Sequence, residues 1–428
     1  MKIVFVAHYY PPVNSSGAKR VEAISKYLAA DGHEVTVITT QKTSADGDFT
    51  EVIPKRVRLI ELNWLGRNSP SVESKASFEP MYTGSPSWKR RTKDLVMNLF
   101  GQLPDPRLPM AISFATPWLS ASARAALSTA DVVIGSAPPW PTLLAALIAK
   151  WRFKVPCILD YRDHFSDCHE MPGGRFAKWL ERVVDRRLVK AADAVVTISP
   201  PMQTYYGQMR DGVACILNGF DHEVLDAARE VAMPNRRDGL VYVRYMGIVS
   251  PGRVPHNVLR ALMQFRQEDP AQFSRIRFEF YGNAALVGEA IASKYPSIAS
   301  AFSYHAAVPY VQSLQLIIEA DYALFSETSS RASISAQGIL TTKLFEYIGS
   351  GRPILADISA ETLAGSVLKQ ANPDHVVGNS PDLFLQVFRR PDFFERRPDN
   401  TSDSVMKFSR RAQATEYAEL IARTVHRS

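Results

Sequence analysis

The sequence predicts an α/β protein of two Rossmann-like, doubly wound domains that face each other across a cleft. In both halves, short apolar runs alternate with segments of helical periodicity, which is the pattern of parallel sheets covered by helices. A polar, irregular stretch at residues 222–239 separates the halves. The length of 428 residues also exceeds that of one ordinary domain. We therefore expect domains at 1–221 and 240–403, joined by a linker at 222–239.

The N-terminal domain begins with a βαβ pattern. Residues 2–7 predict a strand, 18–31 a helix and 35–39 a second, parallel strand. The loop after the first strand opens onto a helix N-terminus, the usual phosphate-binding corner of a doubly wound sheet. The loop lacks the G-x-G-x-x-G fingerprint of dinucleotide-binding proteins, but Gly17 allows the backbone to approach a ligand closely.

A pair of charged residues ends another strand of this domain. Residues 156–161 predict a buried strand, and Arg162 and Asp163 follow it. Because side chains at the carboxyl ends of parallel strands point into the ligand crevice, these two are our candidates for catalytic or acceptor contacts. The alternative is that they form an Arg–Asp pair that braces the loop.

The C-terminal domain has its charged candidates in two loops. Residues 240–247 predict its first strand, and the next loop carries Arg253 at the entrance of a helix. Residues 339–356 predict a loop, a short helix and a strand, and the hydroxyl of Thr341 or Thr342 can cap the start of that helix.

Lys343 and Glu346 lie three residues apart at the start of the same helix. A helix N-terminus attracts phosphate, Lys343 adds a full charge, and Glu346 could accept hydrogen bonds from a ribose diol. This arrangement fits a nucleotide diphosphate site. An ordinary exposed Lys–Glu pair, worth about 0.2–0.5 kcal/mol, fits equally well.

Composition and charge narrow the class of protein. Charged residues make up 22% of the chain and hydrophobic residues 46%, as in soluble globular proteins. The three cysteines lack metal-ligand spacing and fit a reducing compartment. The net charge of +7 suits an anionic substrate, and without a nucleic-acid-binding motif we expect no nucleic acid partner. Residues 1–12 do not resemble a signal peptide, so we expect a cytoplasmic protein.

Two polar segments have alternative interpretations. Residues 89–100 begin with a basic stretch at Lys89 and end with a mainly apolar stretch at Phe100. This segment either lies on an anionic membrane or is a packed helix with a solvated face. Asp46 and Asp48 form a D-x-D pattern, which binds metal in some glycosyltransferases, but we expect an exposed loop there and no metal site.

Several motifs together resemble family 4-type glycosyltransferases of the GT-B fold. The opening KIVFVAHYYPPVNSSGAKRVEAISKYLAADGHEVTVIT is close to the N-terminal pattern of the family. So are SAPP at 136–139, DYRDHF at 160–165, ADAVVTIS at 192–199 and LNGFD at 217–221. KLFEYIGSGRPIL at 343–355 matches the nucleotide-binding helix of the family. The resemblance covers most of the chain, with a gap near residues 50–118.

The resemblance implies transfer of a sugar from a nucleotide-sugar donor, with retention at the anomeric carbon, no metal and no cofactor. The C-terminal half would bind the donor and the N-terminal half a glycan, lipid-linked or small-molecule acceptor. Carried over by position, the donor contacts would be Gly17, Arg253, Thr341, Thr342, Lys343 and Glu346. Family members with an RD pair and a KLFEY helix mostly resemble enzymes of bacterial surface polysaccharide assembly. This resemblance implies a peripheral place at the inner membrane face, with residues 89–100 as the contact.

Three departures from the family pattern leave other readings open. Gly338 stands where the family often has a first glutamate, separated by seven residues from the second at Glu346, and Arg162 and Asp163 replace a common histidine. The family lysine a few residues after Arg253 is also absent. The alternatives are a sugar-nucleotide 2-epimerase of the same fold and a non-catalytic nucleotide-sugar-binding subunit. The C-terminal segment 404–428 is expected to form a helix that packs back on the first half.

Overall fold

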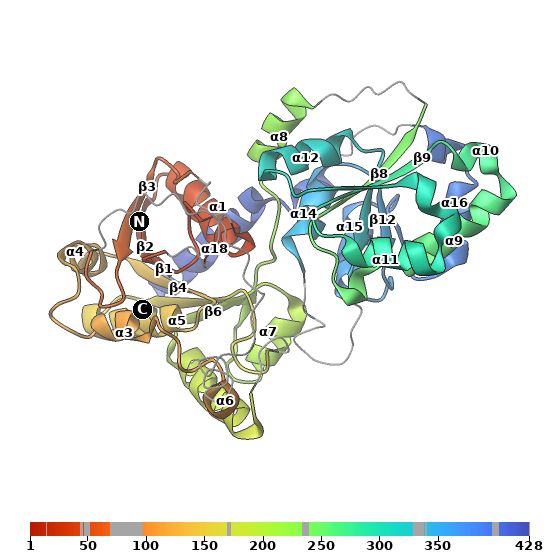
Figure 1. Cartoon of the computed structure of the whole chain (residues 1–428). Helices are drawn as coiled ribbons and strands as arrows, with labels where there is room; N and C mark the ends of the chain where they lie inside the picture. Colours follow the sequence, from red (N-terminus) through yellow and green to blue (C-terminus); the bar gives the residue numbers. More distant parts are fainter. Residues whose placement is uncertain are drawn as a thin grey trace. The chain divides into compact units, whose positions relative to one another are not determined.

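The computed structural model divides the chain into two compact units, each an α/β sandwich (Figure 1). It describes residues 1–13, 15–42, 46, 52–68, 97–168, 173–232, 239–327, 338, 340–395 and 402–427. Unit 1 consists of residues 1–217, 333–338 and 413–428, and unit 2 of residues 218–332 and 339–412. The predicted pair of Rossmann-like domains is confirmed.

Unit 1 contains a parallel sheet whose seven strands in the described residues have the order β3-β2-β1-β4-β5-β6-β7. The strands are β1 (Lys2–Ala7), β2 (Glu34–Thr40), β3 (Val57–Leu62), β4 (Val132–Ala137), β5 (Cys157–Tyr161), β6 (Ala194–Thr197) and β7 (Ala214–Cys215). The helices are α1 (Ser16–Ala30), α3 (Leu108–Ser113), α4 (Ala121–Ser128), α5 (Pro141–Phe153), α6 (Arg175–Ala191), α7 (Pro200–Gly207) and most of α18 (Arg410–His426).

Unit 2 repeats this topology in the order β10-β9-β8-β11-β12-β13. The strands are β8 (Val241–Met246), β9 (Ile276–Tyr281), β10 (Phe302–His305), β11 (Tyr322–Ser326), β12 (Ile354–Asp357) and β13 (Val376–Gly378). The α-helices are α8 (His222–Val231), α9 (His256–Glu268), α10 (Pro270–Phe273), α11 (Ala285–Lys294), α12 (Tyr310–Glu319), α14 (Thr342–Gly349), α15 (Leu363–Ala371), α16 (Pro381–Phe388) and α17 (Asp403–Met406). Short 3-10 turns lie at Pro251–Arg253, Pro296–Ala301 and Pro391–Phe394.

The strand order places one crevice at the carboxyl edge of each sheet. In a doubly wound sheet, ligands bind outside the carboxyl ends of the strands where the strand order reverses. In unit 1 that point lies between β1 and β4, and in unit 2 between β8 and β11. The loops that follow these four strands are therefore the places to look for a site.

The core of unit 1 covers both faces of its sheet. One apolar cluster joins the sheet to α3, α4 and α5, and a second joins the other face to α1 and α18. Tyr417, Leu420 and Ile421 of α18 belong to this second cluster, together with Ile3 and Phe5 of β1. The C-terminal helix thus packs on the first half of the chain from Gln413 onward.

The predicted linker at 222–239 is wrong over its first ten residues. Residues 222–231 form helix α8, with the Asp221 carboxylate accepting from the Glu223 backbone N–H at 3.2 Å. Leu225 and Ala228 are buried, and α8 packs against α12 in unit 2. The boundary also falls earlier than residue 221, because the Phe220 backbone pairs with Phe408 and Arg410 of unit 2.

Candidate functional site

Helix α14 of unit 2 starts beside the switch point between β8 and β11. Thr341 takes the N-cap position with an extended backbone, but its side chain makes no capping hydrogen bond. Its hydroxyl oxygen is buried and has no hydrogen-bond partner among the described residues, so the expected hydroxyl cap is wrong. The helix is fixed to the sheet instead by Tyr347, whose hydroxyl accepts from the Met246 backbone N–H at 2.8 Å.

Lys343 lies on the end of β8. Its ammonium nitrogen is 3.9 Å from the centre of the Tyr245 ring, and a Cβ added to Gly247 would lie 3.5 Å from that nitrogen. Burial, reinforced by the charge of Arg253, lowers the pKa of Lys343 to about 8, while Glu327 and Glu346 oppose this change. A bound anion would favour the protonated form of Lys343 and so restore its full positive charge. Lys343 is therefore suited to bind phosphate.

Arg253 forms an ion pair across the switch point. It ends the 3-10 turn after β8, and its Nε donates to the carboxylate of Glu327, which follows β11 directly. The side chain of Arg253 is 27% exposed and that of Glu327 is 10% exposed. Glu327 therefore orients the guanidinium while leaving part of it accessible.

Glu346 lies one turn into α14 and pairs with Tyr310, the first residue of α12. The Tyr310 hydroxyl donates a hydrogen bond to the Glu346 carboxylate, and burial together with this charge raises the pKa of Tyr310 well above its ordinary value. A carboxylate has about four lone-pair sites and can accept several hydrogen bonds. The hydrogen bond fixes the direction in which Glu346 points.

Five of the six predicted donor contacts therefore lie in unit 2. Arg253 and Glu346 are both close enough to affect the charge of Lys343, and Thr341 precedes Lys343 at the N-cap of α14. Thr342 is the first residue of the helix. The sixth, Gly17, lies in unit 1.

Gly17 contacts Arg162 in unit 1. The backbone oxygen of Gly17 accepts from Arg162 Nη1, and a Cβ added to Gly17 would lie 3.1 Å from that nitrogen and 3.2 Å from Tyr9. Gly17 therefore lets the loop lie directly on the guanidinium group. Its role as a donor contact stays a prediction.

Arg162 braces the carboxyl edge of the first sheet. Besides Gly17, its guanidinium donates to the backbone oxygens of Ala137 at 3.2 Å and Pro138 at 2.6 Å, so it joins the loops after β1, β4 and β5. The side chain is buried, and burial lowers its pKa while Asp160 and Asp163 oppose the change. This geometry gives Arg162 a positioning role, whereas Asp163 is exposed at the same edge.

A buried polar cluster lies at the ends of β1 and β2. His8 Nδ1 is hydrogen-bonded to the Thr40 hydroxyl, and His8 Nε2 lies 2.8 Å from the Asp46 carboxylate and 3.0 Å from Arg107. Burial lowers the pKa of His8 to about 4, so the ring is neutral near pH 7. Lys42 donates to the Thr40 backbone oxygen at 2.7 Å, and burial lowers its pKa to about 7.

This cluster corrects the reading of the D-x-D segment. The Asp46 side chain is only 6% exposed and pairs with His8 and Arg107, so the expectation of an exposed loop is wrong at Asp46. Gly47 and Asp48 lie outside the described residues.

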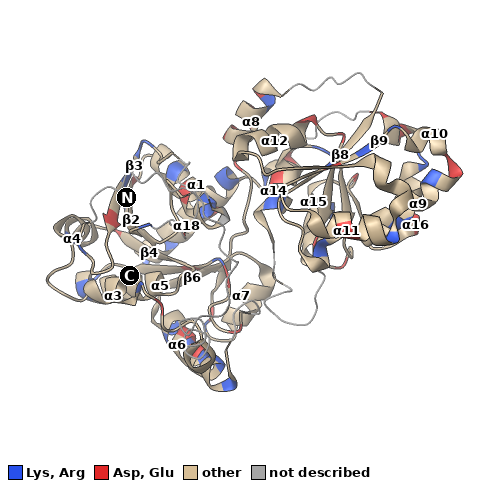
Figure 2. Cartoon of the chain, in the orientation of Figure 1, with Lys and Arg blue, Asp and Glu red and all other residues tan. Residues whose placement is uncertain are grey.

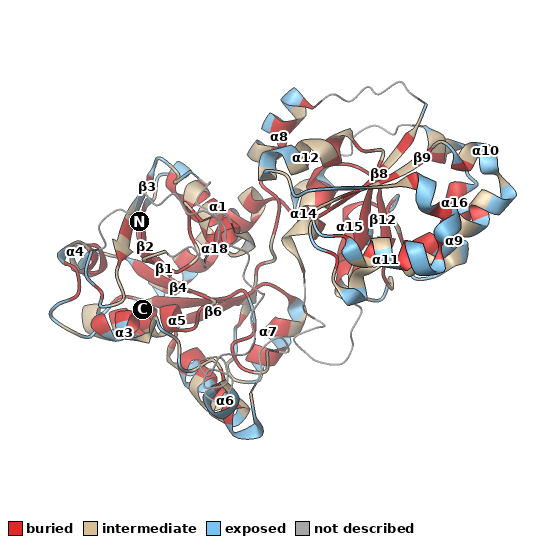
Figure 3. Cartoon of the chain, viewed as in Figure 1, coloured by how far each residue is buried: buried red, intermediate tan, exposed pale blue. Residues whose placement is uncertain are grey.

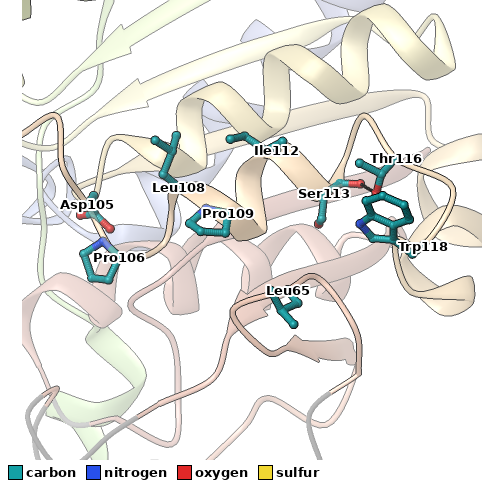
Figure 4. A pocket seen from close by; sticks show the side chains of 9 residues that line it. All are labelled: Leu65, Asp105, Pro106, Leu108, Pro109, Ile112, Ser113, Thr116 and Trp118. Atoms are coloured by element: carbon teal, nitrogen blue, oxygen red, sulfur yellow. Dashed lines mark hydrogen bonds between the residues drawn. The ribbon is translucent and has the colours of Figure 1, made fainter.

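An apolar pocket of about 470 Å³ runs along α3 in unit 1 (Figure 4). The side chains of Leu65, Ile112 and Trp118 face it and are 62%, 49% and 62% exposed. Asp105 lines one end, and Arg107 bonds to Asp105 and also reaches His8 at the end of β1. The volume of the pocket is in the range of roughly 300–1,000 Å³ that holds small ligands.

Sequence reasoning missed three residues of these sites, namely His8, Glu327 and Tyr310. His8 and Glu327 each follow a strand at a switch point, so the rule used for Arg162 could have found them. Tyr310 had no such signal, because it starts a helix far from Glu346 in the sequence.

Comparisons with known proteins agree with this architecture. Residues 17–214 match a protein family described as "Glycosyl transferase 4-like domain". No curated protein sequence matches the chain.

Solved structures resemble the whole chain at low identity. A glycosyltransferase from Rickettsia africae matches with 13% identity and a TM-score of 0.58, covering 100% of this chain and 99% of that one. Anabaena HepE in complex with UDP-glucose matches with 14% identity and a TM-score of 0.56, covering 99% of both chains. UDP-GlcNAc 2-epimerase from Methanocaldococcus jannaschii matches with 11% identity and a TM-score of 0.51, also covering 99% of both.

At such identities these likenesses establish the fold alone. The expected family resemblance is confirmed for residues 17–214, which include Gly17 and Arg162. These residues form a glycosyltransferase 4-like domain, and the chain as a whole has the GT-B fold of the solved glycosyltransferases that it resembles.

Proposed function

We propose that the protein transfers a sugar from a nucleotide-sugar donor to a glycan or lipid-linked acceptor, with retention at the anomeric carbon and without a metal. The observation that carries this proposal is the charged group in unit 2, where Lys343, Arg253 and Glu346 surround the switch point between β8 and β11. Doubly wound sheets bind nucleotides at this place.

Each part of the group suits one part of a nucleotide diphosphate. Lys343 and Arg253 supply positive charge, and the N-terminus of α14 with the unpaired Thr341 hydroxyl supplies donors for phosphate oxygens. The Glu346 carboxylate suits the ribose diol. Charge-assisted hydrogen bonds of this kind contribute roughly 1.5–3 kcal/mol each.

The same contacts would assist the reaction. A hydroxyl oxygen of the acceptor bonds to the anomeric carbon as the bond from that carbon to the diphosphate oxygen breaks. The electron pair leaves with the diphosphate, which takes up the hydroxyl proton. Cations that hold the diphosphate stabilise the charge that develops there, and this lowers the barrier.

The acceptor would bind at the carboxyl edge of unit 1, near Asp163 and His8. The apolar pocket along α3 supports an acceptor with an apolar aglycone, such as a lipid-linked sugar. We retain a peripheral place at the cytoplasmic face of a membrane as part of the proposal. Most of the candidate segment 89–100 lies outside the described residues, which resume at residue 97.

The test is calorimetric titration with uridine and guanosine diphosphates and their sugars. Glu346→Gln should weaken binding of the preferred nucleotide sugar by roughly tenfold or more. Glu289→Gln, an exposed glutamate on α11, is the matched control. If Glu346→Gln binds the donor as tightly as the control does, the assignment of the ribose contact is wrong. If the wild type binds no nucleotide, the proposed site is not a donor site.

A 2-epimerase is the second candidate, because Gly338 replaces the first glutamate of the family pattern and because one structure with this fold is a 2-epimerase. The two activities differ in what happens without an acceptor. Incubation with the preferred donor alone would change the configuration of the sugar in an epimerase, whereas a transferase would leave the donor intact until an acceptor is added.

A further inference from the structure

Helix α6 of unit 1 carries an unusual division of its charges. Its only acidic residues, Glu181 and Asp185, are both fully buried. The exposed residues of the helix are Arg175, Phe176, Trp179, Arg182, Arg186, Arg187 and Lys190. Figures 2 and 3 show the resulting basic, exposed side of α6.

The buried acids hold α6 in a fixed orientation. The Glu181 carboxylate accepts from the Gln102 backbone N–H at 2.7 Å and from Lys178 at 3.1 Å. Asp185 accepts from the Tyr161 hydroxyl at 2.8 Å and from the Ser166 hydroxyl at 2.5 Å. These bonds turn the opposite side of the helix outward, so the exposed cations and aromatic rings belong to a rigid surface.

Large apolar side chains gather at the N-terminal end of this surface. Phe176 and Trp179 stack at 5.7 Å between ring centres and are 59% and 54% exposed. Residues 97–100 lie beside them, because the Gly174 backbone N–H donates to Asn98 at 2.9 Å. This segment contributes two further exposed apolar side chains, Leu99 and Phe100, which are 48% and 44% exposed.

We propose that this α6 surface (Leu99, Phe100, Phe176 and Trp179 with Arg175, Arg182, Arg186, Arg187 and Lys190) docks on an anionic lipid bilayer. Single exposed apolar residues are ordinary on protein surfaces, but a group on neighbouring elements marks an interaction site. Aromatic rings favour the headgroup level of a bilayer, and exposed arginines and lysines attract anionic lipids. The part of the chain that the structure describes has no helix able to cross a membrane, so the contact is a surface one.

Charge complementarity selects this partner. Of the five exposed cations, Arg182 pairs with Asp167 at 2.7 Å, and the exposed side of α6 carries no acidic residue of its own. A single-stranded nucleic acid could use the cations and rings, but it would leave the side chains of Leu99 and Phe100 in water. A bilayer accommodates all four apolar side chains.

The α6 surface adjoins the edge of the sheet where the acceptor is proposed to bind. β5 is parallel to its neighbours and runs into the loop before α6, so the N-terminal end of α6 lies at the carboxyl edge of the sheet. That edge also carries Asp163. A bilayer at the N-terminal end of α6 would bring a lipid-linked substrate to this edge, although bilayer binding itself does not depend on the proposed transfer reaction.

Sedimentation with lipid vesicles tests the proposal. The full chain should bind vesicles of phosphatidylcholine with phosphatidylglycerol, bind poorly to phosphatidylcholine alone, and be released by salt. Phe176→Ala with Trp179→Ala should weaken binding by roughly tenfold or more. Arg186→Gln with Arg187→Gln should weaken it roughly 25-fold, because each cation near the surface contributes about fivefold.

Matched controls come from exposed residues of the same unit. Trp151→Ala removes a tryptophan that is 54% exposed on α5, and Lys55→Gln with Arg56→Gln removes two adjacent exposed cations. Both should bind vesicles as the wild type does. Absence of wild-type binding to anionic vesicles, or equal losses in test and control variants, would overturn the proposal. So would binding to single-stranded RNA in place of vesicles.

A spectroscopic measurement covers the case in which the double variant folds poorly. Vesicles with brominated acyl chains should quench tryptophan fluorescence in the wild type and in Trp151→Phe. Trp179→Phe, which keeps the aromatic ring, should lose most of that quenching. Quenching that persists in Trp179→Phe would place the contact elsewhere and refute the proposal.

Discussion

The hydroxyl of Tyr310, at the start of α12, hydrogen-bonds to the carboxylate of Glu346 on α14. The pair joins two helices of unit 2 and sets the direction of the carboxylate proposed to bind ribose. Tyr310→Phe should therefore weaken donor binding by roughly three- to tenfold, the effect of losing one hydrogen bond of about 0.5–1.5 kcal/mol. Titration of the single variants and of the combination with Glu346→Gln measures this. Full additivity would show that Tyr310 does not act through Glu346.

Donor affinity should fall as the pH rises through about 8. Burial and Arg253 lower the pKa of Lys343 from 10.5 to about 8, so above that pH the free protein loses the charge that the diphosphate needs. The free energy of unfolding changes in the opposite sense, because it increases as the pH rises. The folded chain favours neutral Lys343, so this residue destabilises the fold below pH 8, and the destabilisation disappears between pH 8 and 10.5.

Titrations at pH 7 and pH 9 check this prediction. Lys343→Met should bind the donor weakly at both values, with a smaller pH dependence than the wild type. A variant with the wild-type pH profile would show that another group titrates.

Arg162 and Asp163 should separate into a positioning residue and a contact residue. Arg162→Lys loses the planar fork that reaches Gly17, Ala137 and Pro138, so unfolding should become easier by about 1–3 kcal/mol. Asp163→Asn should lower turnover and leave the unfolding free energy within about 0.5 kcal/mol, as for other surface substitutions. Urea unfolding and initial rates distinguish the two. The reverse pattern would exchange the two assignments.

Introducing the glutamate of the family pattern at Gly338 should lower the stability of the fold. A Cβ there would lie 2.8 Å from the Ser199 hydroxyl oxygen, so Gly338→Glu should cost about 1–3 kcal/mol of stability. Adding Ser199→Gly should recover part of this loss. Thermal melts of the three variants test the idea, and a stable Gly338→Glu protein would show that the site has room for a side chain.

The apolar pocket along α3 should matter for one class of acceptor only. Ile112→Ser and Leu65→Ser should lower kcat/KM for a lipid-linked acceptor by roughly tenfold, because each removes apolar contact with the aglycone. The same variants should transfer to a soluble glycan at the wild-type rate. Equal losses for both acceptors would point to a structural defect.

The sequence predicts the central strands of both sheets, because they are largely apolar runs such as residues 2–7 and 240–247. It does not predict the edge strands β3, β7, β10 and β13. It predicts the grouping of Lys343 and Glu346 from local spacing, and that of Arg253 from its place after a strand. It fails where tertiary contacts decide. Helix α8 has only Leu225 and Ala228 buried, so its apolar stripe is too thin to recognise.

Asp46 illustrates the same limit at a candidate site. Its neighbours in the sequence are small and polar, which favours an exposed loop. Its partners His8 and Arg107 come from the end of β1 and the start of α3, and no local pattern relates them to Asp46. The pairing of Tyr310 with Glu346 cannot be predicted from the sequence for the same reason. Pairs made by distant segments become visible only when the sheets have been assembled.

The return of α18 to the first unit has a topological consequence. Residues 1–217 and 413–428 belong to unit 1, so unit 2 is inserted between them, apart from the short return to unit 1 at residues 333–338. A truncation before Tyr417 would therefore uncover β1 through loss of Tyr417 and Ile421. Exchange of donor specificity between relatives would require two crossover points, whereas a swap of the C-terminal half alone would leave unit 1 with a foreign final helix.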